Sequence, residues 1–276
     1  MSNDKKISDF TGLVAVVTGG SSGIGRGIAE ALIAEGATVI VTGSNETTLT
    51  AAAAEIGATP IVADVRDAAA VQALADRVIA DFGKVDILVN NAGLGALAPF
   101  DDLSIEDFHW VFDVNFWGVL HGLKSFVPLL KQNPTGGYIV NVSSLAGFLA
   151  APGGTAYAAS KAAMNALTEA LAAELADSPI GFSILLPAPV RTAIDENSRK
   201  RPGFNKNSPN SGDFVPPLTR LEPDEVAAMV IHAMRTGEKF IVTHPETWPV
   251  VDARHAELRG AHERSLRSSR IERRPG

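Results

Sequence analysis

The sequence predicts a single doubly wound α/β domain, in which a parallel sheet of about seven strands is covered by helices on both faces. Short apolar runs rich in β-branched residues alternate with alanine-rich helical stretches along most of the chain, and parallel strands need such crossover helices between them. The apolar runs also lack the polar–apolar alternation of a half-exposed strand, which indicates that both faces of the sheet are buried.

The alternation assigns each expected element a place along the chain. Strands are expected at 13–18, 38–42, 59–63, 85–90, 138–142, 182–186 and 239–243. Helices are expected at 23–35, 47–56, 67–82, 105–130, 156–176 and 223–235. Asp67 is the expected N-cap of its helix, because an aspartate there accepts a backbone N–H of the first turn.

Two segments depart from this alternation. Residues 193–221 contain several prolines and the basic run Arg199-Lys200-Arg201, and a connection of this length without secondary structure is typically either a lid over a binding site or disordered. Residues 251–276 are rich in arginine and are predicted to form a solvated helix that frays into a tail. We therefore expect a catalytic domain at 1–250 and a separate tail.

Composition excludes several classes of protein. With 276 residues, 46% hydrophobic and 20% charged, the chain is neither collagen-like nor disordered throughout. Its net charge of −7 argues against nucleic-acid or anionic-membrane partners. The absence of cysteine excludes disulfides and thiolate sites, and no metal site is expected because the histidines lack ligand spacing. With no signal peptide or membrane span expected, the cytoplasm is the expected location.

A glycine-rich segment, Thr18-Gly19-Gly20-Ser21-Ser22-Gly23-Ile24-Gly25, joins the first expected strand to the first helix. Glycines there let the backbone approach a pyrophosphate, and the helix N-terminus supplies N–H groups and partial positive charge. The spacing G-x-x-x-G-x-G differs from the general dinucleotide fingerprint, but its position favours a dinucleotide coenzyme. The expected contacts in this loop are Gly19, Ser21, Ser22, Gly23, Ile24 and Gly25.

The end of the second expected strand bears on which coenzyme is bound. It ends in Gly43-Ser44-Asn45, without the carboxylate that usually binds a ribose 2′-hydroxyl, although Glu46 is close. Ser44 and Asn45 are expected to contact the ribose, and Arg26 is a candidate cation for a 2′-phosphate. NADP(H) is therefore favoured, and NAD(H) remains possible.

Tyr157 and Lys161 lie at positions i and i+4 of an expected helix and so share one face. A free tyrosine has a pKa near 10, and a nearby cation favours the phenolate that general acid–base catalysis uses. Ser144 follows the strand at 138–142, where a hydroxyl faces the ligand crevice of a doubly wound sheet. The three residues indicate proton transfer to or from a carbonyl or alcohol oxygen.

With these motifs the chain resembles the classical short-chain dehydrogenases/reductases, a family with a Rossmann-like fold, over about residues 12–245. The motifs follow one another in the family's order: T-G-x-x-x-G-x-G at 18–25, Asp64-Val65, N-N-A-G at 90–93, Asn115 in V-N-F-W-G, Ser144 in N-V-S-S, and Y-x-x-x-K from Tyr157 to Lys161. Each motif is modest, but all six in order are highly specific.

The resemblance implies a role for each catalytic residue. Tyr157 is the implied acid–base, and Ser144 positions the reacting oxygen. Lys161 lowers the pKa of Tyr157 and holds the nicotinamide ribose, and Asn115 anchors a water that links Lys161 to solvent. The family spacing selects Ser144, so the neighbouring Ser143 is expected to be structural.

The resemblance also implies coenzyme contacts beyond the glycine loop. Asp64 and Val65 are the implied partners of the adenine. The remaining implied contacts are Asn91, Ala92, Gly93, Tyr157, Lys161, Pro187, Val190 and Thr192. Ala188 stands where the family usually has glycine, and its methyl makes a positive φ costly. We expect a changed pocket shape but not a loss of coenzyme binding.

The expected substrate pocket is mostly small or apolar. Its predicted lining is Leu94, Ser144, Leu145, Ala146, Pro152, Gly153, Gly154 and Ala188, together with the 193–221 segment. This lining favours a ketone or secondary alcohol with hydrophobic or bulky substituents, as used by carbonyl reductases and alcohol dehydrogenases. Arg191 and the basic run at 199–201 are the residues that would instead suit an anionic substrate.

Other functions remain open at this point. The chain can be a catalytically silent dinucleotide-sensing regulator or scaffold, or it can perform lyase or epimerase chemistry on the same fold. The resemblance implies a homodimer or homotetramer through the helices that carry Asn115 and Tyr157, and 108–130 is apolar on more than one face. The acidic residues Asp101, Asp102, Glu106 and Asp107 are interpreted as loop acids and helix N-terminal charges.

Overall fold

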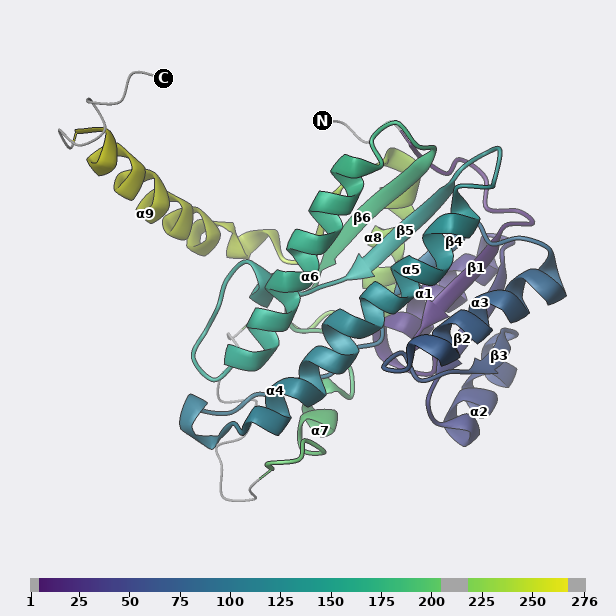
Figure 1. The fold of residues 1–276 in the computed structure, drawn as a ribbon, viewed down its shortest axis with the longest axis horizontal. Coiled ribbons are helices and arrows are strands. Elements are labelled where there is room, and N and C mark those ends of the chain that lie inside the picture. Colours follow the sequence, from purple (N-terminus) through teal and green to yellow (C-terminus); the bar gives the residue numbers. More distant parts are fainter. Residues whose placement is uncertain (1–4, 205–217, 268–276) are drawn as a thin grey trace. The chain divides into compact units, whose positions relative to one another are not determined.

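The structure is a computed structural model that describes residues 5–204 and 218–267 (Figure 1). The chain divides into two compact units, Met1–Thr243 and His244–Gly276. Each unit is described by itself.

The larger unit is built on one seven-stranded sheet with the strand order β3-β2-β1-β4-β5-β6-β7. The strands are β1 (Val14–Thr18), β2 (Thr38–Gly43), β3 (Thr59–Val62), β4 (Ile87–Asn90), β5 (Gly137–Val142), β6 (Ile180–Leu186) and β7 (Phe240–Val242). Every neighbouring pair is parallel. The predicted doubly wound parallel fold is confirmed.

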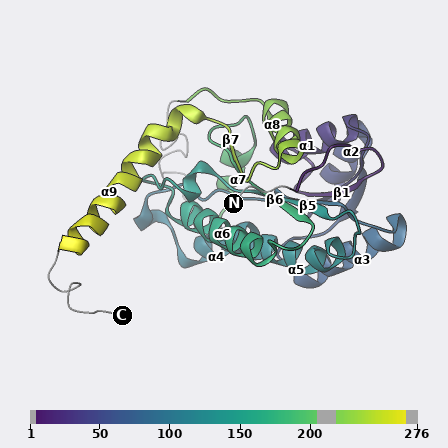
Figure 2. The same ribbon diagram turned by 90° about the horizontal axis from the view of Figure 1, so that it is seen from above.

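Helices cover both faces of this sheet, as the view along its edge shows (Figure 2). The covering helices are α1 (Gly23–Ala34), α2 (Glu46–Ile56) and α8 (Pro223–Thr236) on one face and α3 (Ala68–Phe82), α5 (Gly118–Leu130) and α6 (Thr155–Glu174) on the other. The unit also contains α4 (Ile105–Phe112) and α7 (Ile194–Ser198), which contribute no described residue to the cores on these two faces. Alternate strand residues join opposite cores: Val17 packs with α1, α2 and α8, whereas Val16 packs with α3, α5 and α6. Burial on both faces explains the continuous apolar strands.

Local side-chain chemistry sets several helix starts. Asp67 accepts the backbone N–H groups of Ala69 and Ala70, which confirms the predicted N-cap of α3. Asn45 accepts the N–H of Thr48 in the same way, so α2 begins one residue earlier than predicted. The capping side chains therefore fix where the chain leaves each loop.

The predicted uninterrupted helix at 105–130 is wrong in its middle. Between α4 and α5 the chain forms a π-helical turn, Asp113–Trp117, that contains the fully buried Asn115. The Asn115 side chain there accepts the N–H of Leu94 and donates to its carbonyl oxygen. The hydrogen bonds that one buried amide makes cannot be predicted from hydrophobic periodicity. π-helical turns are frequent at functional sites.

The segment after β6 also has more structure than expected. It contains α7, and Val190 forms an isolated parallel bridge with Leu221. The expectation of a connection without secondary structure is therefore wrong for these residues. The rest of the predicted 193–221 segment, residues 205–217, lies outside the described residues.

The smaller unit contains helix α9 (Trp248–Arg267), which confirms the helix predicted for the tail. Its arginines at 254, 259, 264 and 267 are exposed, and those at 270, 273 and 274 lie outside the described residues. None of the described helices has the length and apolar character that a membrane crossing requires.

Candidate active site

The predicted site residues follow strands that end at one edge of the sheet. All strands are parallel, so their carboxyl ends lie together, and β1 and β4 are adjacent although they are not consecutive in the chain. In doubly wound sheets a ligand binds in the crevice outside such a reversal of strand order. The loops at this edge are 18–25, 43–45, 64–65, 91–93, 143–144 and 187–192.

The glycine loop between β1 and α1 leaves no room for larger side chains. Gly23 has a φ of +54°, and a Cβ there would lie 2.9 Å from Cγ2 of Thr192. A Cβ on Gly25 would overlap the amide of Asn91, which donates to the carbonyl oxygens of Thr18 and Gly19. Close packing within the protein therefore requires glycine at both positions.

The first turn of α1 presents its N–H groups at the same place. Its N-cap, Ser22, has an extended backbone and makes no side-chain capping hydrogen bond. Helix N–H groups that no side chain caps, together with the helix dipole, suit an anion. The residues present therefore fit the diphosphate of a dinucleotide coenzyme.

The residues expected near the adenosine have partners within the protein. Arg26, the candidate cation for a 2′-phosphate, bonds to Glu30 at 2.9 Å and to Glu55 at 2.8 Å. Asp64 pairs with Arg66 at 2.6 Å, and hydrogen bonds from Arg66 lower the pKa of the Asp64 carboxyl. Asp64 is therefore ionised at neutral pH, and two carboxylates already offset the charge of Arg26.

Lys161 is buried below the crevice on α6. Its Nζ donates to the carbonyl oxygen of Val142, the last residue of β5, at 2.8 Å, and burial lowers the pKa of Lys161 to about 8. A Cβ on Gly93 would lie 3.4 Å from the same Nζ. The ammonium group thus lies where the N-N-A-G segment after β4 meets the end of β5.

Tyr157 and Ser144 meet above Lys161. The Ser144 hydroxyl hydrogen-bonds to Tyr157, and Nζ of Lys161 is 5.8 Å from the centre of the tyrosine ring. Burial raises the pKa of Tyr157, and the Ser144 hydrogen bond offsets only part of that rise. Desolvation of the phenol is the largest influence on this pKa, and the expected lowering of it by Lys161 stays a prediction.

Asn115 connects the π-helical turn to both sides of the site. Besides its two bonds to Leu94, its Nδ2 donates to Oγ of Ser160 at 3.0 Å. A Cβ on Gly93 would lie 3.5 Å from its Oδ1. The polar atoms of this side chain thus hold the loop after β4 against α6.

The loops predicted to line the substrate pocket are joined by main-chain hydrogen bonds. The N–H of Leu145 donates to Pro187 at 2.9 Å, and that of Ala98 donates to Gly153 at 2.9 Å. Ala188 donates to Oγ1 of Thr243, and no described residue other than glycine has a positive φ. The alanine thus adds a methyl group without backbone strain. These loops carry Leu94, Leu145, Ala146, Pro152, Gly153, Gly154 and Ala188.

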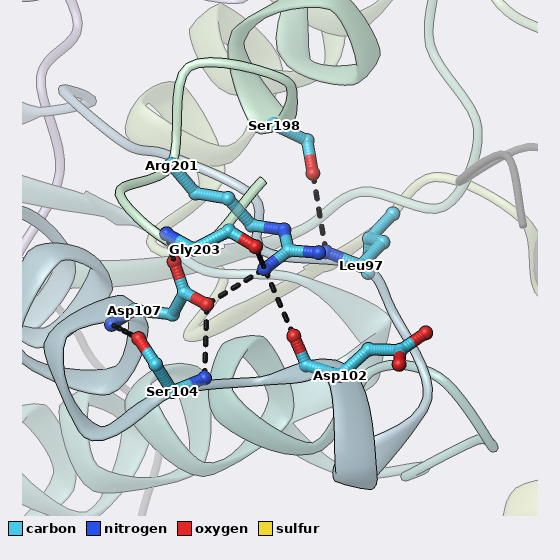
Figure 3. A network of polar contacts seen from close by, with 7 residues as sticks. All are labelled: Leu97, Asp102, Ser104, Asp107, Ser198, Arg201 and Gly203. Atoms are coloured by element: carbon cyan, nitrogen blue, oxygen red, sulfur yellow. Dashed lines mark hydrogen bonds and ion pairs between the residues drawn. The ribbon is translucent and has the colours of Figure 1, made fainter. Parts of the chain in front are cut away.

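The structure reveals one polar pair that the sequence did not indicate. Asp107, interpreted above as a helix N-terminal charge, is fully buried and pairs with the equally buried Arg201 at 2.7 Å (Figure 3). Asp107 caps α4 with Ser104, which agrees with its interpretation as a helix N-terminal charge, but the sequence did not indicate its burial or its ion pair. The two residues lie 94 positions apart, so no local pattern signals their contact.

Comparison with known proteins identifies the family. Residues 13–203 match the family model described as short chain dehydrogenase. The chain belongs to this family. It is 36% identical over 249 residues to the probable oxidoreductase EphD of Mycobacterium tuberculosis, covering 87% of this chain and 42% of that protein. The chain thus spans about two fifths of the length of that relative.

Two further similarities cover most of both proteins. The chain is 33% identical to a C alpha-dehydrogenase of Sphingobium sp., over 87% of this chain and 83% of that one. It also resembles the crystal structure of a short-chain dehydrogenase/reductase from Burkholderia phymatum in complex with NAD, with a TM-score of 0.84 and 36% identity. That match covers 92% of this chain and 96% of the other.

In this short-chain dehydrogenase the matched region includes the glycine loop, the π-helical turn and α6. It therefore contains every element that positions Ser144, Tyr157 and Lys161. Members of the family are oxidoreductases that use NAD(H) or NADP(H). This agrees with the glycine loop between β1 and α1, which fits the diphosphate of such a coenzyme. Within the described residues, no group of three or more His, Asp or Glu side chains is placed to hold a metal ion.

Proposed function

We propose that the protein is an oxidoreductase that interconverts a ketone and a secondary alcohol, with NADP(H) as the preferred coenzyme and residues 1–250 as the catalytic domain. One observation carries this proposal. The Ser144 hydroxyl, the Tyr157 phenol and the buried Lys161 ammonium meet at the carboxyl end of β5, next to the loop that fits a dinucleotide.

The bound nicotinamide supplies or accepts the hydride. In reduction, the carbonyl carbon gains that hydride while Tyr157 gives its proton to the carbonyl oxygen. Ser144 donates a hydrogen bond to the same oxygen, and the positive charge of Lys161 stabilises the phenolate that forms. In oxidation, Tyr157 takes the alcohol proton instead.

The raised pKa of Tyr157 determines which protonation state of the phenol is present at neutral pH. A phenol whose pKa is raised by burial keeps its proton, so it is ready to act as the acid in carbonyl reduction. Alcohol oxidation needs the phenolate and therefore gains rate as the pH rises.

The coenzyme preference follows from the end of β2. Gly43, Ser44 and Asn45 carry no carboxylate to repel a 2′-phosphate. Arg26 is already bonded to two glutamates, so it adds little attraction. We therefore expect a modest preference for NADPH over NADH, of about tenfold or less in kcat/KM, although the Burkholderia relative was solved with NAD.

The substrate class follows from the charges around the pocket. Two of the cations expected to suit an anionic substrate have partners within the protein, because Arg191 pairs with Glu222 and Arg201 with Asp107. A neutral ketone with hydrophobic substituents fits the small and apolar lining. A panel of aryl and alkyl ketones tests this with NADPH, and a strong preference for small anionic substrates would reject it.

The chain offers a matched pair of variants for the reaction, since it contains two tyrosines. Tyr157→Phe should reduce kcat by about 10²- to 10⁴-fold, because the general acid is lost, while the Kd for NADPH is retained. Tyr138 is buried and its hydroxyl bonds to Ser183 far from the crevice, so Tyr138→Phe should keep its activity.

The same measurements separate the other candidate functions. A catalytically silent dinucleotide sensor or scaffold would bind NADPH but show no turnover in the wild-type protein with any carbonyl compound. A lyase or epimerase would turn over substrate without net change in nicotinamide absorbance.

We also infer that the protein forms a homodimer or homotetramer. Phe100, Ile105 and Trp117, on and around α4, are 65%, 68% and 47% exposed in the single chain. Exposed large apolar side chains favour association when they lie together on a surface. Light scattering of the purified protein measures the oligomeric state, and a monomer at micromolar concentration would contradict the inference.

A further inference from the structure

A buried polar network holds the segment after α7 (Figure 3). Nη1 of Arg201 donates to Oδ2 of Asp107 at 2.7 Å, to the carbonyl oxygen of Asp102 at 3.1 Å and to that of Gly203 at 2.8 Å. The second carboxylate oxygen of Asp107 accepts the N–H of Gly203 at 2.9 Å. One ion pair thus fixes the backbone of 201–203.

The carboxylate is itself held by the start of α4. Asp107 accepts the N–H of Ser104, and the Ser104 hydroxyl accepts the N–H of Asp107. This reciprocal cap fixes the orientation of the carboxylate before Arg201 binds to it. The network therefore ties the segment after α7 to a rigid helix end.

The same segment lies against the loop that follows β4. Oγ of Ser198, in the last turn of α7, accepts the N–H of Leu97 at 3.1 Å. A Cβ on Gly95 would lie 3.4 Å from Cγ1 of Ile194. Segment 194–204 thus contacts the loop after β4 through α7 and the start of α4 through residues 201–203.

The loop at 94–98 leads directly to the catalytic groups. Leu94 is bonded at both its N–H and its carbonyl oxygen to Asn115, and Ala98 donates to Gly153, four residues before Tyr157. A displacement of α7 would therefore change the wall of the pocket beside the reacting oxygen, although neither Arg201 nor Asp107 touches that oxygen.

We propose that Arg201 and Asp107 are positioning residues that hold segment 194–204 against loop 94–98 and thereby set the affinity and selectivity for the ketone. The pocket part of this inference rests on the proposed carbonyl reduction. Loss of one partner leaves the other charge buried and unpaired, which is strongly unfavourable. The segment then leaves its position so that water can reach the remaining charge.

Hydrogen exchange tests the positioning role without any substrate. In Arg201→Met, peptides that contain Leu97 and Gly203 should exchange at least about tenfold faster than in the wild type, because both amides lose their fixed acceptors. Arg201→Lys should restore part of the protection, since its ammonium carries the charge and several donors. Lys200→Met changes an exposed neighbour in the same segment and should leave both peptides unchanged.

Steady-state kinetics tests the consequence for the pocket. Arg201→Met and Asp107→Asn should each raise KM for the preferred ketone about tenfold and reduce discrimination between bulky and small ketones. The Kd for NADPH should stay within about twofold and kcat within about threefold, because the catalytic residues and the coenzyme loop are untouched. A general loss of structure would instead change all three.

The outcomes separate the two proposals. Unchanged exchange at Leu97 and Gly203 in Arg201→Met overturns the positioning role, whether or not the wild type reduces ketones. Faster exchange with an unchanged KM and selectivity overturns the role in substrate recognition. Absence of ketone reduction by the wild type, with NADPH bound, overturns the proposed function and leaves the exchange result to decide the positioning role.

A second variant applies if Arg201→Met does not fold. Ser198→Ala removes only the acceptor of the Leu97 N–H and leaves the ion pair intact. It should raise exchange at Leu97 and raise KM for the ketone by about twofold to threefold. No change in either quantity would overturn the proposal.

Discussion

The two sides of the crevice are built in different ways. The coenzyme side is shaped by close packing around glycines, as where Gly25 lies against the carbonyl oxygen of Gly19 and the side-chain amide of Asn91. On the substrate side, main-chain hydrogen bonds join the loops, and a few side-chain contacts such as Arg201 with Asp107 hold distant segments together. Coenzyme binding therefore depends on small residues at fixed positions. Substrate recognition depends on individual polar contacts, each of which a single substitution can remove.

Both sides meet at the catalytic residues. Gly93, after β4, lies beside Nζ of Lys161 and the side chain of Asn115, while Ser144 begins the short 3₁₀ turn that leads away to the substrate loops. Variants on one side should therefore leave the other side intact, and variants at the junction should act on the reaction itself.

After Tyr157→Phe, the largest effect is expected at the junction, from Ser144→Ala. Loss of the hydroxyl that polarises the carbonyl should reduce kcat by about 10²- to 10³-fold, with the Kd for NADPH unchanged. The Ser144 hydrogen bond lowers the pKa of Tyr157, so its removal should move the rise of alcohol oxidation with pH to higher values. Initial rates over a pH series measure both effects.

Ser143→Ala provides the control for this variant. Ser143 is buried one residue away, and its hydroxyl has no hydrogen-bond partner among the described residues. Its loss should leave kcat and the pH profile of oxidation unchanged. If Ser143→Ala lost activity and Ser144→Ala kept it, the assignment of the reacting hydroxyl would be wrong.

A smaller effect, confined to the coenzyme side, is expected from Gly25→Ala. The added Cβ would overlap the Asn91 amide and lie 2.6 Å from the carbonyl oxygen of Gly19. Overpacking of this kind costs about 1–3 kcal/mol, which corresponds to NADPH binding that is weaker by about 5- to 150-fold. Fluorescence titration with NADPH measures this change.

Gly43→Ala is the matched control at the same edge of the sheet. A Cβ there would meet only Leu49 at 3.8 Å and Ser21 at 4.0 Å, which are ordinary contacts, and its φ is not positive. Its Kd for NADPH should stay within about threefold of the wild type. Equal losses in both variants would contradict the view that close packing around glycines shapes this side.

The same contrast explains how much the sequence predicted. The parallel sheet followed from buried β-branched runs, and the glycine loop followed from residues whose small size the backbone demands. Both signals are local. The fold and the family motifs could therefore be predicted before any contact was known.

The substrate side could not be predicted in this way. The contact of Arg201 with Asp107 depends on the packing of the segment after α7 against the start of α4. No local sequence pattern predicts that packing. The π-helical turn at Asn115 likewise depends on hydrogen bonds to the main chain of Leu94, which lies 21 positions away in the sequence. The raised pKa of Tyr157 follows from burial, a property of the folded site that the i, i+4 spacing with Lys161 does not reveal.

At Lys161 the expected effect concerns stability and not binding or catalysis. Burial lowers the pKa of Lys161 to about 8, whereas an unfolded lysine has a pKa near 10.4. Between these values the unfolded chain binds more protons than the folded one. The free energy of unfolding of the wild type should therefore rise with pH over this window, relative to Lys161→Met.

Urea unfolding of the coenzyme-free protein at pH 7, 8, 9 and 10 measures this difference. Lys161→Met also removes the hydrogen bond to Val142, but that loss is independent of pH and shifts all points equally. The difference between the two proteins should thus be flat below about pH 8 and change by roughly 1.4 kcal/mol per pH unit above it. Lys124→Met, at an exposed position of α5, is the control. A difference that stays constant from pH 7 to pH 10 would show that burial does not lower the pKa of Lys161 and that water reaches the junction.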